Sequence, residues 1–278
     1  MSNMLEKGII TVAIGKKFAK QAKHLASSCI LHSPHIPRAV LTDCRKYLEP
    51  YYDIIIDYNK EFGEPFETKT RLDLFSPFKK NLFLDADSLV INNIDFYFDL
   101  LDHSSFLYYG IPRHDGVWYF DIEKVKKEHS LDYIPEFNSG MLLFCTNENT
   151  KEIFRTANEF MQDPSALNVG FFRGKLYPDE PFLALAFAKM GIKPFEDYGR
   201  FSRTLIGAEC IKLNVVKGYA RFKKYGSFVF PSVVHFCGKL GNFFYSVEKA
   251  RLFFFTSSYF YNTIGKIPVF FRNIFKKK

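Results

Sequence analysis

Two acidic residues, Asp85 and Asp87, are separated by a single alanine and follow the apolar stretch 82–84. In open α/β sheets, ligands bind beyond the carboxyl ends of the strands, so acids that directly follow a strand are well placed for binding. Two such carboxylates can reach one hard cation, Mn²⁺ or Mg²⁺, which in turn neutralises a diphosphate. The alternative is a turn whose acids cap the segment from Ser88 onward. The spacing alone leaves both interpretations open.

A histidine near the C-terminus, His235, follows two valines and precedes Cys237, Gly238 and Lys239. A histidine at a strand end can give an imidazole nitrogen to a metal. The glycine allows close approach of the backbone to a phosphate, and the lysine can neutralise that phosphate. The alternative is an ordinary core histidine with its hydrogen bonds satisfied.

Two further polar segments could act on a substrate. Asp179 and Glu180 precede the apolar stretch 182–190, where they either cap a helix or turn a carboxylate toward a reacting carbon. Asn138 and Ser139 precede another apolar stretch, 140–145. They form either an ordinary turn or a hydrogen-bonding corner for hydroxyl groups.

These residues need a scaffold, and the hydrophobic pattern predicts one. Apolar residues recur at three- and four-residue spacing from Ala19 to Ile30, which indicates a helix that ends near Ser33 and Pro34. We expect further helices over 150–161 and 182–190, and strands over 9–14, 39–42, 52–56, 82–84, 140–145 and 233–236. Strands that alternate with helices predict an α/β fold with a mostly parallel sheet.

Charge is distributed unevenly along the 278 residues. The net charge is +8, and seven of those charges lie in residues 239–278. A nearly neutral body argues against a nucleic-acid-binding protein. The five cysteines form no CxxC pair, which argues against a zinc module and fits a reducing compartment.

The C-terminal residues have a composition of their own. Nine Phe and three Tyr lie in residues 243–278, interspersed with lysine and arginine. We therefore expect a catalytic domain over 1–242 and a basic aromatic helical extension over 243–278. Such an extension can lie in a membrane interface or pack its aromatic rings on the body. No leader and no spanning helix is expected, which predicts a cytoplasmic protein at the inner membrane face.

Four segments in this order resemble glycosyltransferase family 8, the group that includes glycogenin and bacterial lipopolysaccharide galactosyl- and glucosyltransferases. They are Phe-Leu-Asp-Ala-Asp-Ser-Leu-Val, Phe-Asn-Ser-Gly, Asp-Glu and Val-Val-His-Phe-Cys-Gly. The resemblance covers residues 9–240. It implies a GT-A fold (Rossmann-like), a UDP-sugar donor, a divalent metal such as Mn²⁺, and transfer with retention at the anomeric carbon.

The resemblance also implies roles for single residues. The metal ligands would be Asp85, Asp87 and His235. The residues that bind the nucleotide and its phosphates would be Ala13, Ile14, Phe18, Lys69, Ala86, Gly238 and Lys239. The residues that contact the transferred sugar would be Asp179, Asn138 and Glu180. The position of Glu180 is often Gln in that family.

The expected function is thus transfer of a hexose from a UDP-sugar to a glycan or lipid-linked acceptor. One alternative is a nucleotidyltransferase, which normally carries a glycine-rich, basic loop after its first strand. Gly15-Lys16-Lys17 is a poor match to such a loop. The other alternative is a non-catalytic membrane-binding module whose acids are structural.

Overall fold

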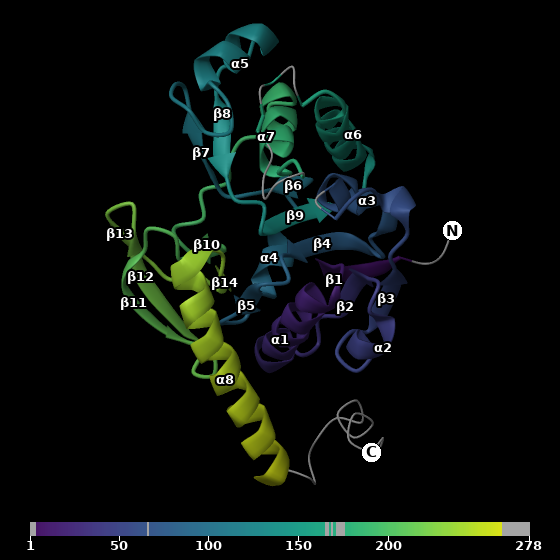
Figure 1. Cartoon of the computed structure of the whole chain (residues 1–278), viewed down its shortest axis with the longest axis vertical. Coiled ribbons are helices and arrows are strands. Elements are labelled where there is room, and N and C mark those ends of the chain that lie inside the picture. The colour runs from purple at the N-terminus through teal and green to yellow at the C-terminus, as the bar shows by residue number, and fades with distance from the viewer. Residues whose placement is uncertain (1–3, 66, 165–166, 168, 171–175, 263–278) are drawn as a thin grey trace. The chain divides into compact units, whose positions relative to one another are not determined.

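The structure is a computed structural model (Figure 1). It describes residues 4–65, 67–164, 167, 169–170 and 176–262, with side chains described up to residue 256. Strands and helices alternate through the first half of the chain, as the hydrophobic pattern predicts.

A six-stranded sheet has the order β3-β2-β1-β4-β9-β6. The pairs β1–β4 and β2–β3 are parallel, and β6–β9 is antiparallel. The mostly parallel α/β sheet predicted from the sequence is therefore confirmed. Its strands are β1 (Leu5–Ala13), β2 (Arg38–Thr42), β3 (Ile54–Asp57), β4 (Phe78–Leu84), β6 (Phe106–Leu107) and β9 (Met141–Cys145).

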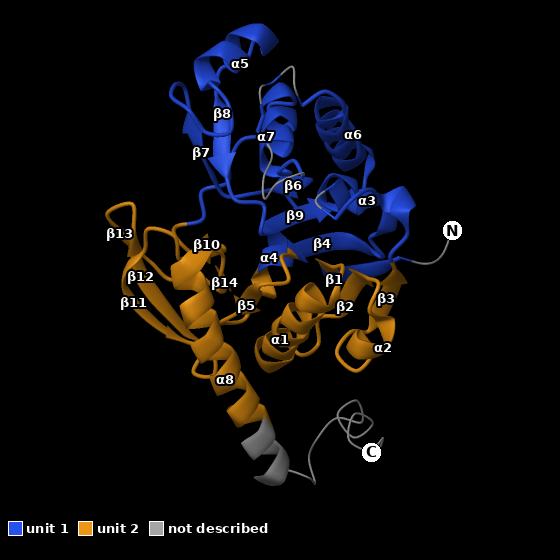
Figure 2. Cartoon of the chain, viewed as in Figure 1, with its two compact units in different colours: residues 1–10, 58–83, 97–197 blue, residues 11–57, 84–96, 198–278 orange. Residues whose placement is uncertain are grey.

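The chain divides into two compact units (Figure 2). Unit 1 holds residues 1–10, 58–83 and 97–197, and unit 2 holds residues 11–57, 84–96 and 198–278. The predicted boundary at 242/243 does not coincide with this division, because it falls inside one helix of unit 2.

Unit 1 is built around an aromatic core. The rings of Tyr108 and Phe187 stack with their centroids 4.1 Å apart, and Phe106 contacts Phe144 and Phe154. Besides its sheet strands, the unit contains β7 (Gly110–Arg113), β8 (Ile134–Phe137), η1 (Lys60–Phe62), η2 (Glu67–Arg71), α3 (Leu72–Phe75), α4 (Phe96–Leu100), α5 (Ile122–His129), α6 (Glu148–Gln162) and α7 (Glu180–Lys189).

The two helices predicted for this unit are confirmed, and their sequences explain their ends. Helix α6 begins after Asn147, whose side chain accepts a hydrogen bond from the backbone N–H of Thr150. Helix α7 has Pro181 in its first turn, where a missing N–H costs nothing. Because α7 is apolar on every side, it is buried, and it packs against α6.

Unit 2 contains two small three-stranded sheets besides its share of the main one. One has the order β10-β14-β5, and the other is the antiparallel meander β11-β12-β13. The further elements are α1 (Lys16–His32), α2 (Arg45–Leu48), β5 (Ser88–Val90), β10 (Arg203–Thr204), β11 (Glu209–Asn214), β12 (Tyr219–Lys224), β13 (Ser227–Val229), β14 (Val233–His235) and α8 (Gly238–Asn262).

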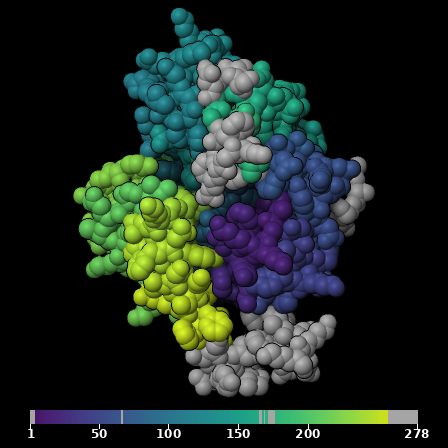
Figure 3. Space-filling model, viewed as in Figure 1, coloured from purple at the N-terminus to yellow at the C-terminus, as the bar shows by residue number. Residues whose placement is uncertain are grey.

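Helix α8 carries the first part of the predicted extension. Its atoms are the yellow ones in Figure 3. Tyr245 and Leu252 are buried in a cluster with the strands of unit 2, whereas Phe243, Phe253 and Phe254 are exposed. Some aromatic rings thus pack on the body and others face outward. The lysine-rich end of the extension lies outside the described residues. Among the described residues, no helix has both the length and the apolar composition to cross a membrane.

Candidate active site

The two acids lie where the chain leaves β4 and enters β5. The backbone N–H of Ser88 donates to the carbonyl of Asp85 at 2.9 Å, which closes a tight turn. Strand β5 pairs antiparallel with β14, and this register sets Ser88 beside His235. The backbone N–H of Phe236 also donates to the carbonyl of Asp87 at 3.0 Å. A backbone scaffold therefore joins segments that are 150 residues apart in the sequence.

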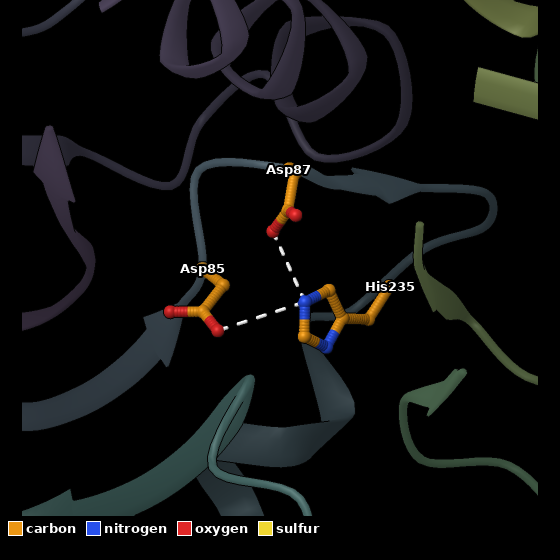
Figure 4. A group of neighbouring side chains, drawn as sticks. All are labelled: Asp85, Asp87 and His235. Atoms are coloured by element: carbon orange, nitrogen blue, oxygen red, sulfur yellow. Dashed lines mark ion pairs between the residues drawn. The ribbon is translucent and has the colours of Figure 1, made fainter. Parts of the chain in front are cut away.

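Three side chains converge at this turn (Figure 4). The Nε2 atom of His235 lies 3.0 Å from Oδ1 of Asp87 and 3.7 Å from Oδ2 of Asp85. One ligand atom from each residue lies within 4.8 Å of the others. Two hard carboxylate oxygens and an imidazole nitrogen suit Mn²⁺ or Mg²⁺. Asp85, Asp87 and His235 therefore lie as close together as the predicted metal site requires, and metal binding stays a prediction. We call these three residues the metal cluster.

The residues predicted to hold a nucleoside lie in unit 2 as well. Ala13 and Ala86 are buried in one cluster, so the ends of β1 and β4 come together there. The ring of Phe18 is 37% exposed and thus accessible to a stacking partner. The backbone N–H of Gly15 donates to Oδ1 of Asp43 at 2.7 Å. The N–H of Gly15 is thus bound to a carboxylate. This arrangement does not favour a phosphate-binding loop of the kind that a nucleotidyltransferase carries.

Ile14, Gly238 and Lys239 complete the predicted nucleotide-binding set in unit 2. Ile14 is half-buried, and Gly238 and Lys239 are exposed at the start of α8. The backbone of Gly238 has a φ of 77°, a conformation that is unfavourable for residues with a side chain. Glycine therefore suits this position.

A second polar cluster, the carboxylate cluster, lies in unit 1 around Glu180. Its Oε2 accepts a hydrogen bond from the hydroxyl of Tyr119 at 2.6 Å. Its Oε1 accepts from Nδ2 of Asn138 at 2.8 Å and from the backbone N–H of Ser139 at 3.1 Å. Three donors therefore fix both oxygens of this carboxylate.

Asp179 is buried next to Glu180, at the start of α7. Its Oδ2 lies 3.5 Å from Nζ of Lys69, which also donates to Oγ of Ser139 at 3.0 Å. The side chain of Asp179 makes no capping hydrogen bond to its helix, and the backbone of Asp179 is helical. The capping interpretation therefore does not describe Asp179. The structure groups Lys69, Asn138, Asp179 and Glu180, all four of them predicted site residues.

Neighbouring charges perturb the carboxylate cluster. Burial raises the pKa of Glu180, and the negative charge of Asp179 raises it further. The hydroxyl of Tyr119, the ammonium of Lys69 and the N–H of Ser139 act in the opposite direction by stabilising the ionised form. A carboxyl group whose pKa is raised by burial and by a neighbouring charge is typical of catalytic sites.

Sequence patterns did not single out Tyr119 of the carboxylate cluster, Asp43 beside Gly15, or Lys224, a buried lysine on β12. Tyr119 is 61 positions from its partner Glu180, and nothing local marks it. Asp43 directly follows β2, so its place after a strand was a usable signal. Lys224 is in phase with Ala220 and Phe222 on β12, which a two-residue period could have revealed.

The chain is similar to known proteins in its structure. No protein-family model and no curated protein matches the chain. The galactosyltransferase LgtC, solved with donor and acceptor sugar analogues, matches with a TM-score of 0.57 and 16% identity. That match covers 96% of this chain and 99% of LgtC. The chain has the GT-A fold.

Two further structures agree with this assignment. An active-site mutant of LgtC matches at 19% identity with a TM-score of 0.53, over 84% of this chain and 88% of the mutant. The bifunctional glycosyltransferase WbbM in its apo form matches at 11% identity with a TM-score of 0.50, over 85% of this chain and 46% of WbbM. At these low identities the structural likeness shows the GT-A fold alone. The chemistry of the chain must therefore be argued from its own residues.

Proposed function

We propose that the protein is a metal-dependent glycosyltransferase that moves a hexose from a UDP-sugar to a glycan or lipid-linked acceptor with retention. The observation that carries this proposal is the metal cluster at the end of β4, within a GT-A fold. The galactosyltransferase LgtC, which has this fold, was solved with donor and acceptor sugar analogues, and this supports a sugar donor and acceptor here.

The metal, Mn²⁺ or Mg²⁺, would be held by Asp85, Asp87 and His235. When bound, it would stabilise the negative charge that develops on the departing diphosphate. Because a histidine ligand must be neutral and a carboxylate must be ionised, metal affinity should fall in acid.

The nucleotide would lie against the ends of β1 and β4. Phe18 would stack on the base, next to Ala13 and Ile14, and Ala86 would lie under the ribose. The amide of Gly238 and the ammonium groups of Lys239 and Lys69 would bind phosphate oxygens. The exposure of Phe18, Gly238 and Lys239 supports these roles.

The carboxylate cluster would act on the transferred sugar. The bond between the anomeric carbon and the diphosphate breaks with its electron pair on the diphosphate. The acceptor oxygen bonds to the same carbon, and its proton passes to an oxygen of the departing diphosphate. Asp179 would stabilise the positive charge on that carbon, and its Oδ2 accepts no hydrogen bond within the described part of the chain. Glu180 and Asn138, which are hydrogen-bonded to each other, would bind the sugar hydroxyls.

The extension would bring the enzyme to the cytoplasmic face of a membrane, where a lipid-linked acceptor resides. The exposed rings of Phe243, Phe253 and Phe254 on α8 support this role. So does the net charge of residues 239–278, since basic segments are attracted to anionic lipid.

The proposal can be tested by measuring UDP release from a panel of UDP-sugars, with Mn²⁺ and with EDTA. We expect metal-dependent release from one sugar in the wild type and none in Asp87→Ala. Asp99→Ala, which removes an exposed acid on α4, is the matched control and should behave as wild type. Release that persists in EDTA would contradict the metal-dependent mechanism. Absence of both release and UDP binding would overturn the transferase proposal.

A further inference from the structure

One strand of unit 2 carries a charge on its apolar face. Along β12, Ala220, Phe222 and Lys224 are buried, whereas Tyr219, Arg221 and Lys223 face outward. Ala220 and Phe222 belong to the hydrophobic cluster of the unit, and Lys224 is only 8% exposed. Lysine is almost never buried to this extent without an anionic partner, so its position calls for a physical reason.

The partners of this lysine are neutral. Its Nζ donates to the carbonyl oxygen of Thr204 at 2.9 Å and to the Oγ1 of Thr204 at 2.6 Å. The ring of Tyr225 lies 5.5 Å from the ammonium. Within the described part of the chain no carboxylate accepts a hydrogen bond from Lys224. The ammonium can make three hydrogen bonds, so an anion could take the third.

The position of Thr204 connects this ammonium to the metal cluster. Strands β10 and β14 are parallel, and their register pairs Thr204 with His235. Paired residues on neighbouring strands project their side chains from the same face of a sheet. The hydroxyl that binds Lys224 and the imidazole of the metal cluster therefore share one face. Cys237, which precedes the predicted phosphate-binding Gly238, is close enough to Lys224 to influence its charge.

We propose that Lys224 binds a phosphate oxygen of the nucleotide diphosphate, next to the metal held by Asp85, Asp87 and His235. This inference rests on the proposed function and adds to it a residue on β12. Thr204 would orient the ammonium through its carbonyl and hydroxyl oxygens, and burial would strengthen its attraction for the anion.

The charged surroundings of Lys224 support such a role. Burial lowers its pKa to about 8, and the positive charge of Arg203 on β10 also lowers it. Cys237 acts in the opposite direction. An anion placed against the amine favours its protonated form, so binding above about pH 8 should draw a proton onto Lys224.

The test is calorimetry with two probes, UDP and inorganic pyrophosphate, each with Mg²⁺. Lys224→Met keeps the length of the side chain and removes its charge, and Lys223→Met removes the outward-facing charge next to it. We expect Lys224→Met to weaken both probes about tenfold or more. Lys223→Met should bind as the wild type does. Equal affinities of wild type and Lys224→Met would overturn the inference and leave the proposed function standing.

A second measurement separates binding from a structural role. At about pH 8.5 the phosphates of UDP are already ionised, so protons taken up on binding enter the protein. Titrations in buffers of different ionisation enthalpy should show proton uptake in the wild type and its loss in Lys224→Met. Uptake of equal, non-zero size in the wild type and in Lys224→Met would place the proton on another group and overturn the inference. If the wild type binds pyrophosphate but not UDP, the proposal of a uridine nucleotide is refuted. The effect of Lys224→Met on the affinity for pyrophosphate then decides whether Lys224 binds phosphate. Binding of neither probe would refute both proposals.

Discussion

The carboxylate cluster of unit 1 and the metal cluster of unit 2 are organised in opposite ways. In unit 1 both oxygens of Glu180 accept hydrogen bonds from protein donors, and Lys69 lies beside Asp179. In unit 2 two carboxylates converge on one imidazole, and among the described residues the buried Lys224 donates its hydrogen bonds to neutral oxygens of Thr204. The first cluster is held in place by the chain itself. The second gathers charges that a cation and an anion would compensate.

The largest expected effect is on the metal cluster. Asp87→Asn keeps the shape of the side chain but removes a charge that the cation requires. We expect sugar transfer to fall about 100-fold or more. We also expect Mn²⁺ to raise the melting temperature of the wild type and not that of the variant. A variant that is stabilised by Mn²⁺ as much as the wild type would show that Asp87 is not a ligand.

The next effect concerns the stability of unit 2. Because burial lowers the pKa of Lys224, folding is opposed by its charge at neutral pH and should become more favourable as pH rises from about 8 toward the unfolded value near 10.5. Lys224→Met should raise the free energy of unfolding at pH 7 by up to about 3 kcal/mol and flatten this pH dependence. Urea titrations between pH 7 and 10 measure both, with Lys223→Met as the control. A variant less stable than the wild type at pH 7 would contradict the expected burial cost.

A smaller effect is expected in unit 1, where the chain supplies its own donors. Tyr119→Phe removes the 2.6 Å hydrogen bond to Glu180 and leaves the other two in place. Turnover should fall about tenfold, with metal affinity unchanged. Tyr133→Phe in the same unit is the matched control. Equal turnover in Tyr119→Phe and wild type would mean that the two remaining donors are sufficient to hold the carboxylate.

The smallest effect should be at the surface of α8. Replacing Phe253 and Phe254 by serine removes two exposed rings, and we expect sedimentation with anionic vesicles to fall about fivefold. Leu74→Ser, which changes an exposed apolar residue in unit 1, should have no effect. UDP release in solution should not change. If the double variant sediments as the wild type does, the membrane contact is not made by these rings.

Much of the fold could be predicted because its signals are local. The β-branched run before Ala13 and the apolar stretch before Asp85 are strands, and the periodic residues from Ala19 to Ile30 form α1. The metal cluster could be predicted because Asp85, Asp87 and His235 each follow or end a strand, and strand ends meet at one edge of a sheet.

The rest depends on contacts that short windows do not contain. The strands between residues 203 and 229 are short and rich in lysine and arginine, so they resemble a loop in composition. In the sequence, Lys223 and Lys224 resemble two solvent-exposed lysines. The pairing of β12 with its neighbouring strands turns Lys223 outward and Lys224 inward. Asn138, which follows β8, meets Glu180 because α7 packs against β8, a contact between segments some 40 residues apart. Tyr119 lies 61 positions from Glu180, outside any short window.

The division into two units also bears on how such a chain can be inherited. The chain passes from one unit to the other at 10/11, 57/58, 83/84, 96/97 and 197/198. A recombination event with one breakpoint between residues 11 and 197 would therefore exchange parts of both units at once. Whichever side of such a breakpoint carries Glu180 also carries either Asp85 and Asp87 or His235, so a single crossover cannot exchange the carboxylate cluster without part of the metal cluster.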